Sequence, residues 1–238
     1  MRSFMIVGVF GVVLSISGAG TAQNGPGKIA PERGTMGGAA TFRPDLDTRQ
    51  SYFAYNQMLD YAKCTSGLGN KLVVEALAQQ PFSAAEQAQF LQLDVRLRSC
   101  KRAGLTNIHS LRRGSLAEGL YHKAKVDPGT LPPLSKDAPQ YAAFMRPEAT
   151  YNSLRDGPDQ PMIAATNCLA AEQPVLADAV LATKHGTDAE AATMDKLFAA
   201  APDCAGATRP SHISRSFLRA FLADSLRRYA LFSTKASG

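Results

Sequence analysis

The amino-acid sequence predicts an all-α fold made of two tandem copies of a four-helix module, each copy closed by one internal disulfide bond. Three observations lead to this prediction. The cysteines form two pairs with equal spacing, because 100 − 64 and 204 − 168 are both 36. Apolar residues recur at helical spacing in both halves, and neither sustained alternation nor a hairpin signature supports strands. A shift of 104 positions, 168 − 64, superimposes apolar and capping residues of the first half on those of the second.

The first 22 residues have the features of a secretory signal peptide. Arg2 supplies a positive start, residues 4–16 form a mainly apolar run, and Gly20, Thr21 and Ala22 are small residues suited to a cleavage site. This run is too short to cross a bilayer comfortably, and charges interrupt the other apolar runs. We therefore expect cleavage after Ala22 and a periplasmic or secreted protein with no stable membrane insertion.

Export determines how the four cysteines are interpreted. In an oxidising compartment an even cysteine count predicts disulfides, and four cysteines allow three pairings. If the halves are copies, the simplest pairing is Cys64 with Cys100 and Cys168 with Cys204. Each closed loop then stabilises the fold by about 3.5 to 4 kcal/mol in the chain-entropy description. A metal role would need unpaired cysteines or a CxxC-like spacing, which the sequence lacks.

The segments before and after the two copies are expected to be irregular. The leader, residues 23–47, is rich in Gly, Ala and Thr, and the tail, residues 234–238, is similar. Copy one covers residues 48–125 and opens with a helix over about 48–65. A second helix follows over 71–80, where Leu, Val and Ala recur at helical spacing.

The third helix of each copy begins at the same point of the repeat. Ser83 with Glu86 and Thr187 with Glu190 are capping boxes, in which a hydroxyl and a carboxylate satisfy free N–H groups of the first turn. Each box precedes a helical segment that ends near the second cysteine of its copy. The two boxes superimpose under the 104-residue shift, which supports the duplication.

A linker with a short helix separates the copies. Residues 126–150 begin with a stretch rich in Pro and Gly and include a helix over about 138–145. Copy two, residues 151–233, is expected to have helices over 162–172 and 175–184. Its last helix carries one apolar stripe, formed by Phe217, Leu218, Phe221, Leu222, Leu226 and Tyr229. The matching helix of copy one, residues 111–124, is weakened by Gly114 and Gly119.

Two segments carry a resemblance to a known group of proteins. The sequences LRRGSLAEGLYHK and SRSFLRAFLADSLRRYA each follow a lone cysteine. They resemble segments of uncharacterised exported proteins of sphingomonad-type alphaproteobacteria, a group without an assigned activity. The resemblance covers the last helix and cysteine of each copy, and it implies export and a helical fold but no function.

No catalytic, cofactor-binding or metal site is predicted. The sequence has no GxSxG, HExxH, P-loop or dinucleotide motif. His109 and His212 lie nine and eight residues past the second cysteine of their copies, and we expect a capping or surface role for both. Ser115 is expected to be an ordinary helix residue.

Arginine clusters are the remaining polar feature. We expect solvated helix faces whose stems cover apolar surface, with a lipid headgroup or an acidic partner as the alternative. The net charge of +6, and +5 after loss of Arg2, is ordinary, and nucleic-acid binding is not expected without interleaved exposed aromatics. The clusters are Arg96-Arg98-Lys101-Arg102, Arg112-Arg113 and Arg227-Arg228.

These observations favour a non-enzymatic exported helical protein, interacting or structural, whose partner is an envelope protein. The alternative is a periplasmic binder of a small molecule or lipid in the cleft between the two modules. A binder requires a deep apolar pocket between the copies, whereas an interaction module requires an exposed apolar patch. The sequence does not predict the oligomeric state or whether the modules share one core.

Overall fold

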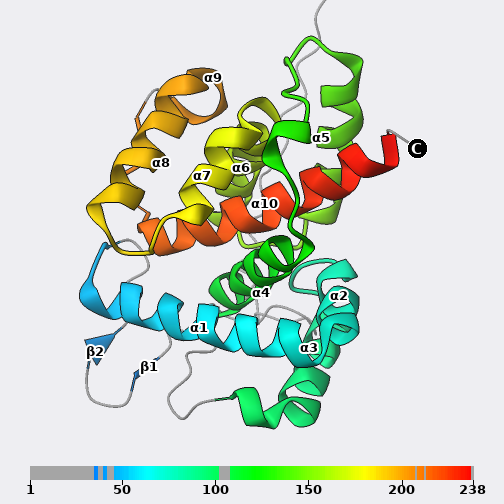
Figure 1. The fold of residues 1–238 in the computed structure, drawn as a ribbon, viewed down its shortest axis with the longest axis vertical. Helices are drawn as coiled ribbons and strands as arrows, with labels where there is room; N and C mark the ends of the chain where they lie inside the picture. The colour runs from blue at the N-terminus through cyan, green and yellow to red at the C-terminus, as the bar shows by residue number, and fades with distance from the viewer. Residues whose placement is uncertain are drawn as a thin grey trace, which may run out of the picture.

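The computed structural model describes residues 35–36, 40–41, 46–101, 108–206, 208–211 and 213–236, and over these residues the predicted all-α class is confirmed (Figure 1). The predicted signal peptide, residues 1–22, lies outside the described residues. None of the described helices is long and apolar enough to cross a membrane.

Two similar series of helices follow one another along the chain. The first half contains α1 (Arg49–Leu68), α2 (Asn70–Ala78), α3 (Ala84–Arg96), the 3-10 helix η1 (Arg98–Cys100) and α4 (His109–Ala124). The connecting segment contains the 3-10 helix η2 (Pro128–Thr130) and α5 (Pro139–Tyr151). The second half contains α6 (Asp159–Glu172), α7 (Pro174–Ala182), α8 (Asp188–Ala200), α9 (Pro202–Ala205) and α10 (Arg215–Ala236).

Local signals explain several helix boundaries. Thr48 caps α1, since its hydroxyl accepts a hydrogen bond from the Ser51 N–H at 3.1 Å while the Ser51 hydroxyl accepts one from the Thr48 N–H at 3.0 Å. Helix α6 begins at Asp159, three residues before the predicted start, and includes Pro161. Proline is tolerated there because N–H groups in the first turn have no partner within the helix.

The expectation of an irregular tail is wrong at its start, and the predicted leader contains a short pair of strands. Within the predicted leader, β1 (Thr35–Met36) and β2 (Ala40–Thr41) form a short antiparallel ladder, with Thr35 opposite Thr41. The strands are two residues each, too short for an alternating pattern to reveal. At the other end, α10 extends through Thr234 to Ala236, so the start of the predicted tail is helical.

The long helices α4 and α10 cross at the centre of the molecule (Figure 1). Helix α1 packs on α4 and α6 packs on α10, so each half supplies a pair of helices on its own side of the crossing. The two backbones meet closely at Gly114, where an added Cβ would lie 2.4 Å from Ala220 Cα. The glycine that lowers the helix propensity of α4 is therefore required for the crossing.

The buried apolar residues form three clusters that together join the halves. One cluster belongs to α1–α4 and η1, and another to the second half with contributions from α4, α5 and the connecting segment. The third contains residues of α1 and α4 together with residues of α6 and α10, including Met58, Leu111, Ile163 and Phe221. The two halves therefore share apolar core rather than forming two separate beads.

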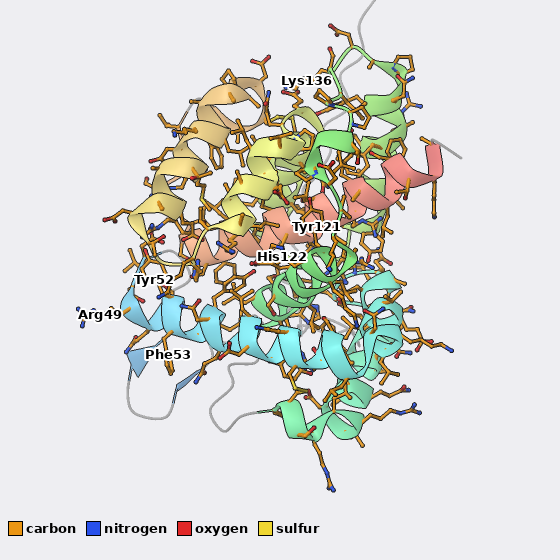
Figure 2. All side chains as sticks on the ribbon, viewed as in Figure 1. Arg49, Tyr52, Phe53, Tyr121, His122 and Lys136 are labelled. Carbon is orange, nitrogen blue, oxygen red and sulfur yellow. A yellow bond between two sulfur atoms is a disulfide. The ribbon has the colours of Figure 1, made fainter. Side chains whose placement is uncertain are left out.

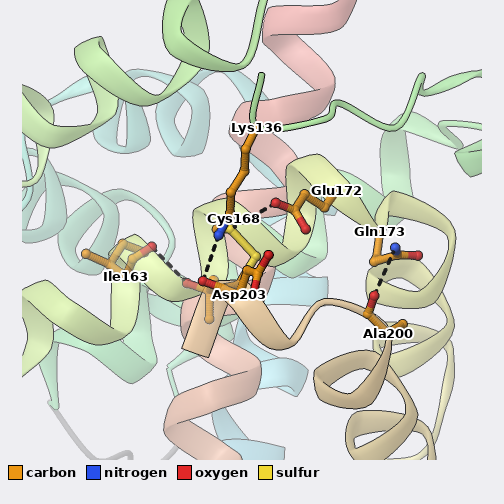
Figure 3. The surroundings of a disulfide bond; sticks show 9 residues. Lys136, Ile163, Cys168, Glu172, Gln173, Ala200 and Asp203 are labelled. Carbon is orange, nitrogen blue, oxygen red and sulfur yellow. Dashed lines mark hydrogen bonds between the residues drawn. A yellow bond between two sulfur atoms is a disulfide. The ribbon is translucent and has the colours of Figure 1, made fainter. Parts of the chain in front are cut away.

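Both disulfides have the predicted pairing. Cys64 of α1 is bonded to Cys100 of η1, and Cys168 of α6 to Cys204 of α9. Each bond ties the first helix of a half to the segment that precedes its long last helix. Figure 3 shows the second bond, at the junction of α6 and α9.

Candidate functional site

Two buried arginines occupy corresponding places on α4 and α10. Arg113 and Arg219 are 219 − 113 = 106 positions apart, the offset that aligns the last helices once two extra residues of the second half are counted. Their side chains are 0% and 2% exposed. A buried guanidinium is costly unless it is paired with carboxylates and its remaining N–H groups are satisfied. The partners of these two arginines are therefore the natural place to look for chemistry.

Arg113 binds carboxylates from both halves. Its Nε donates to Asp224 Oδ2 at 2.7 Å, and its Nη1 donates to Glu86. Its Nη2 and Nη1 also donate to the carbonyl oxygens of Leu77 and Gln79, at 3.1 and 3.3 Å. Arg155 adds a second guanidinium, with its Nη2 2.6 Å from Asp224 Oδ2. We call Glu86, Arg113, Arg155 and Asp224 the Arg113 cluster.

Arg219 repeats the same pattern with the halves exchanged. Its Nη2 donates to Glu118 Oε1 at 2.6 Å, and its Nη1 donates to Glu190 Oε1 at 2.9 Å. The carbonyl oxygens of Leu181 and Thr183 accept from the same guanidinium at 2.7 and 3.1 Å. We call Glu118, Arg219 and Glu190 the Arg219 cluster. Each cluster thus joins a capping glutamate of one half to a carboxylate on the long helix of the other half.

The ion pairs keep the buried carboxylates charged. Burial raises the pKa of Asp224, but the charges of Arg113 and Arg155 outweigh it and lower that pKa to about 2. Burial likewise opposes ionisation of Glu118, and the charge of Arg219 lowers its pKa. The pKa of Arg219 is raised, because its carboxylate partners outweigh the effect of burial. All these groups therefore carry their full charges at neutral pH.

The capping glutamates belong to both the helix ends and the clusters. The hydroxyls of Ser83 and Thr187 accept from the N–H groups of Glu86 and Glu190, at 3.1 and 3.3 Å. The two carboxylates reach one residue further back than a standard capping box. Glu86 accepts a hydrogen bond from the Phe82 N–H at 2.6 Å, and Glu190 accepts one from the Gly186 N–H at 2.9 Å. Phe82 and Gly186 are 104 positions apart, like the two glutamates.

A histidine binds each capping glutamate. His109 Nε2 lies 2.6 Å from Glu86 Oε2, and His185 Nδ1 lies 2.7 Å from Glu190 Oε1. His109 was expected in a capping or surface role, and it does support a helix cap. His212, its proposed counterpart, lies outside the described residues. The histidine that binds Glu190 is His185, which precedes α8, and the residue 104 positions before it is Pro81.

The histidine of the second half also contacts a serine. His185 Nε2 lies 2.9 Å from Ser216 Oγ, so Ser216, His185 and Glu190 follow the hydrogen-bond order of a nucleophile, a base and an orienting acid. Ser216 is 0% exposed, however, and Glu190 is also bound to Arg219. A nucleophile must reach its substrate, and a carboxylate paired with arginine supports an imidazolium poorly.

The first half has the same histidine–glutamate–arginine contacts without such a relay. Ser110 is 216 − 110 = 106 positions before Ser216, and its hydroxyl donates to Asp159 at 2.7 Å rather than to His109. The contacts common to both halves are those that hold the caps and the arginines. We therefore interpret the two clusters as structural ties between the halves.

Two of the three arginine clusters are not solvated, which corrects the sequence-based expectation. Arg112, Arg113 and Arg227 are 6%, 0% and 8% exposed. Arg112 donates to Asp94 at 2.6 Å and lies over the ring of Phe90. The third cluster is different, since its described members, Arg96, Arg98 and Lys101, are exposed.

The remaining polar groupings in the described part of the chain include one candidate for a metal site. Among the described residues, one group of possible metal ligands comes together, namely Cys168, Glu172 and Cys204 (Figure 3). Both sulfur atoms belong to the disulfide, so neither is a thiolate available to an ion. Ser115 is a buried helix residue, as expected, and its hydroxyl donates to the Arg112 carbonyl oxygen at 2.9 Å.

A shallow depression of about 580 Å³ lies where α1 meets the turn before α8. It is lined by residues of both halves, among them Arg49, Tyr52, Phe53 and His185, and Figure 2 shows the first three at the start of α1. The depression is open to solvent rather than enclosed. Deeper between the halves, the space is filled by the Arg113 and Arg219 clusters and the shared apolar core.

An exposed apolar stripe runs along α3. It consists of Ala84, Ala88, Leu91 and Val95, at spacings of four, three and four residues that place them on one helix face. Leu91 is 66% exposed and Val95 is 73% exposed. We call these four residues the α3 stripe. Sequence reasoning missed it, because helical spacing of apolar residues does not show which face of a helix stays exposed.

The corresponding face of α8 is also exposed but has different chemistry. The 104-residue shift places Asp188, Ala192, Asp195 and Ala199 at the positions of the α3 stripe. Two carboxylates thus stand where α3 has Ala84 and Leu91. Comparison of the chain with protein-family profiles, curated proteins and solved structures gives no match.

Proposed function

We propose that this chain is a non-enzymatic, exported helical interaction protein of the bacterial envelope, built from two copies of one disulfide-closed module. The α3 stripe is the observation that carries the interaction role. A solvent-exposed leucine and valine one turn apart on an amphipathic helix are suited to packing against a partner helix. The partner we propose is an envelope protein, as the sequence suggests.

The duplication is supported by contacts that recur at fixed offsets. The capping residues and the carbonyl oxygens that receive the two arginines are related by 104 positions, and the arginines themselves by 106. Phe82 and Gly186, also 104 apart, share a positive φ, at 65° and 81°. Gly114 and Ala220, 106 apart, meet each other at the helix crossing.

Export is supported by the cysteines and by the first residues of the sequence. Two disulfides, with no free cysteine among the described residues, are typical of proteins that fold in an oxidising compartment. The N-terminal run with signal-peptide features points the same way. Assignment to a bacterial envelope rests on the resemblance of the last helices to exported alphaproteobacterial proteins.

Charge favours an acidic amphipathic helix as the occupant of the α3 stripe. Arg96 and Arg98 are exposed at the end of the stripe and form no ion pair with a described residue. Asp94, the carboxylate nearest to them in sequence, is bound by Arg112 at 2.6 Å and Lys101 at 3.1 Å. The α3 helix of a second copy would therefore bring no unpaired carboxylate, which disfavours self-association through this face.

The size of the stripe predicts a weak contact. A 13-residue helix is about 20 Å long. Four side chains along it bury much less than the roughly 800 Å² per partner of a standard interface. We expect a reversible complex in which the partner helix extends beyond α3.

Site-specific photocrosslinking in intact cells tests this proposal. A photoreactive amino acid at position 91 is compared with the same amino acid at position 195, the matched exposed site on α8. We expect position 91 to form an adduct with another protein, and peptide mapping to locate it in an apolar helix flanked by Asp or Glu. In a further variant, residue 91 is leucine again, the photoreactive amino acid stands at position 88, and Val95 is replaced by Asp. This variant should form no adduct with the partner.

Three results would contradict the proposal. These are an equal yield at positions 91 and 195, an adduct formed with another copy of the chain, or no protein adduct at position 91. Each would assign the exposed apolar face to something other than an acidic partner helix.

The binder in the cleft between the modules remains the second candidate. The depression at Arg49, Tyr52 and Phe53 favours it, because residues of both halves line it. Its open shape supports it less well than an enclosed pocket would, since small-molecule sites bury most of the ligand surface. We therefore rank it below the interaction role.

A further inference from the structure

Arg227 on α10 is a nearly buried cation with no carboxylate of its own. Arg227 is only 8% exposed, and its guanidinium forms no hydrogen bond or ion pair with any described residue. Burying a guanidinium without an anion costs several kcal/mol. Burial lowers the pKa of Arg227, as expected for a cation that is poorly compensated.

The neighbouring arginines all form ion pairs with carboxylates, so Arg227 is the arginine of this group that lacks one. Arg113 is bound by Glu86 and Asp224, and Arg155 by Asp224. Arg228 is held by Glu148 at 2.5 Å. Glu86, Asp224 and Glu148 thus form their ion pairs with the other three arginines, and no described carboxylate lies within ion-pair distance of Arg227.

The fold does not require a cation at this position. The matching residue of the first half, 227 − 106 = 121, is Tyr121, which is neutral and also buried. A tyrosine fills the corresponding place on α4, so packing alone does not account for the charge on α10. The nitrogens of Arg227 are not among the unpaired polar atoms that are sealed from solvent, so the guanidinium keeps some contact with solvent.

We propose that Arg227 binds a phosphate group, which supplies the missing negative charge at the end of the Arg113 cluster. A guanidinium matches two oxygens of a phosphate with parallel hydrogen bonds. Because only 8% of Arg227 is exposed, its guanidinium can contact a small tetrahedral oxyanion more readily than a bulky ligand. Inorganic phosphate and a lipid phosphate headgroup share this chemistry.

Thermal unfolding of the oxidised full chain tests the site with inorganic phosphate against sodium chloride of equal ionic strength. We expect phosphate at ten times its Kd to raise the Tm by about 3 to 6 °C, by linkage between binding and folding in a chain of this size. Arg227→Gln should abolish the rise. The control Arg96→Gln removes one exposed charge and should still show the rise in Tm.

A second measurement does not depend on added phosphate. Removal of a poorly compensated cation should leave the Tm of Arg227→Gln in chloride equal to or above that of the wild type. Co-sedimentation with phosphatidylglycerol vesicles, compared between the wild type and Arg227→Gln, identifies the source of the phosphate. Vesicle binding that requires Arg227 indicates a lipid headgroup. A rise in Tm with phosphate but no vesicle binding indicates the free anion.

The proposal is overturned if phosphate has no effect beyond ionic strength and vesicles do not bind. It is equally overturned if Arg227→Gln responds like the wild type. A large drop in the Tm of Arg227→Gln in chloride would show that the fold itself pairs this charge.

Discussion

Replacing Gly114 by alanine should destabilise the protein strongly, because it obstructs the crossing of α4 and α10. The added Cβ would lie 2.4 Å from the Cα, Cβ and carbonyl oxygen of Ala220. Carbon atoms in contact are normally about 3.5 to 4 Å apart, so the helices must separate by about 1 Å. That movement also lengthens the ion pairs of Arg113 and Arg219 on either side of the crossing.

The expected loss is about 3 kcal/mol of unfolding free energy, at the upper end for overpacking, because backbone rather than a mobile side chain is in the way. The better helix propensity of alanine offsets about 1 kcal/mol of a larger gross cost. For a chain of this size, the Tm should fall by about 6 to 12 °C. Circular dichroism during thermal and urea unfolding measures both quantities.

Gly67 provides the matched control. It lies in the last turn of α1, and a Cβ added there meets nothing within 4 Å. Gly67→Ala should therefore leave stability unchanged or raise it by about 0.5 to 1 kcal/mol. If Gly114→Ala proves as stable as Gly67→Ala, α4 and α10 do not cross as closely as described. The ion pairs of Arg113 and Arg219 across the crossing would then be in doubt as well.

Two further predictions concern the disulfides and the buried carboxylates. Replacing Cys64 and Cys100 together by alanine should lower the unfolding free energy by about 3.5 to 4 kcal/mol; an unchanged urea midpoint would show that the loop is held without the bond. Because the pKa of folded Asp224 is about 2, below its unfolded value, its stabilising contribution of about 2 kcal/mol is complete above about pH 5. It should be lost as the pH falls towards 2, and equal stability at pH 5 and pH 3 in urea titrations would contradict the pairing.

The features predicted from the sequence are those with local or regularly spaced signals. The equal cysteine spacing predicted both disulfides. Hydroxyl and carboxylate residues three positions apart predicted where α3 and α8 begin. Such signals depend on neighbours in the chain, or on equal spacings that can be compared between two segments, so no knowledge of the packing is needed.

The buried clusters could not be predicted, because their partners are far apart in the chain. Arg113 and Asp224 are separated by 111 residues, and their pairing depends on the angle at which α4 and α10 cross. An arginine in an amphipathic helix is normally placed on the solvated face, and only the arrival of carboxylates from the other half makes burial favourable. His185 was missed because it reaches Glu190 from a position with no histidine in the first half.

The exchange of carboxylates between the halves makes neither half self-sufficient. A fragment that ends after α4 would keep Arg113 but lose Asp224, and a fragment that begins at α6 would keep Arg219 but lose Glu118. Two identical single-copy chains would instead satisfy both arginines at once across a twofold axis through the crossing, as in an isologous dimer. Covalent linkage of such a pair would free the two surfaces to diverge, so that one face could carry leucine and valine while the other carries aspartates.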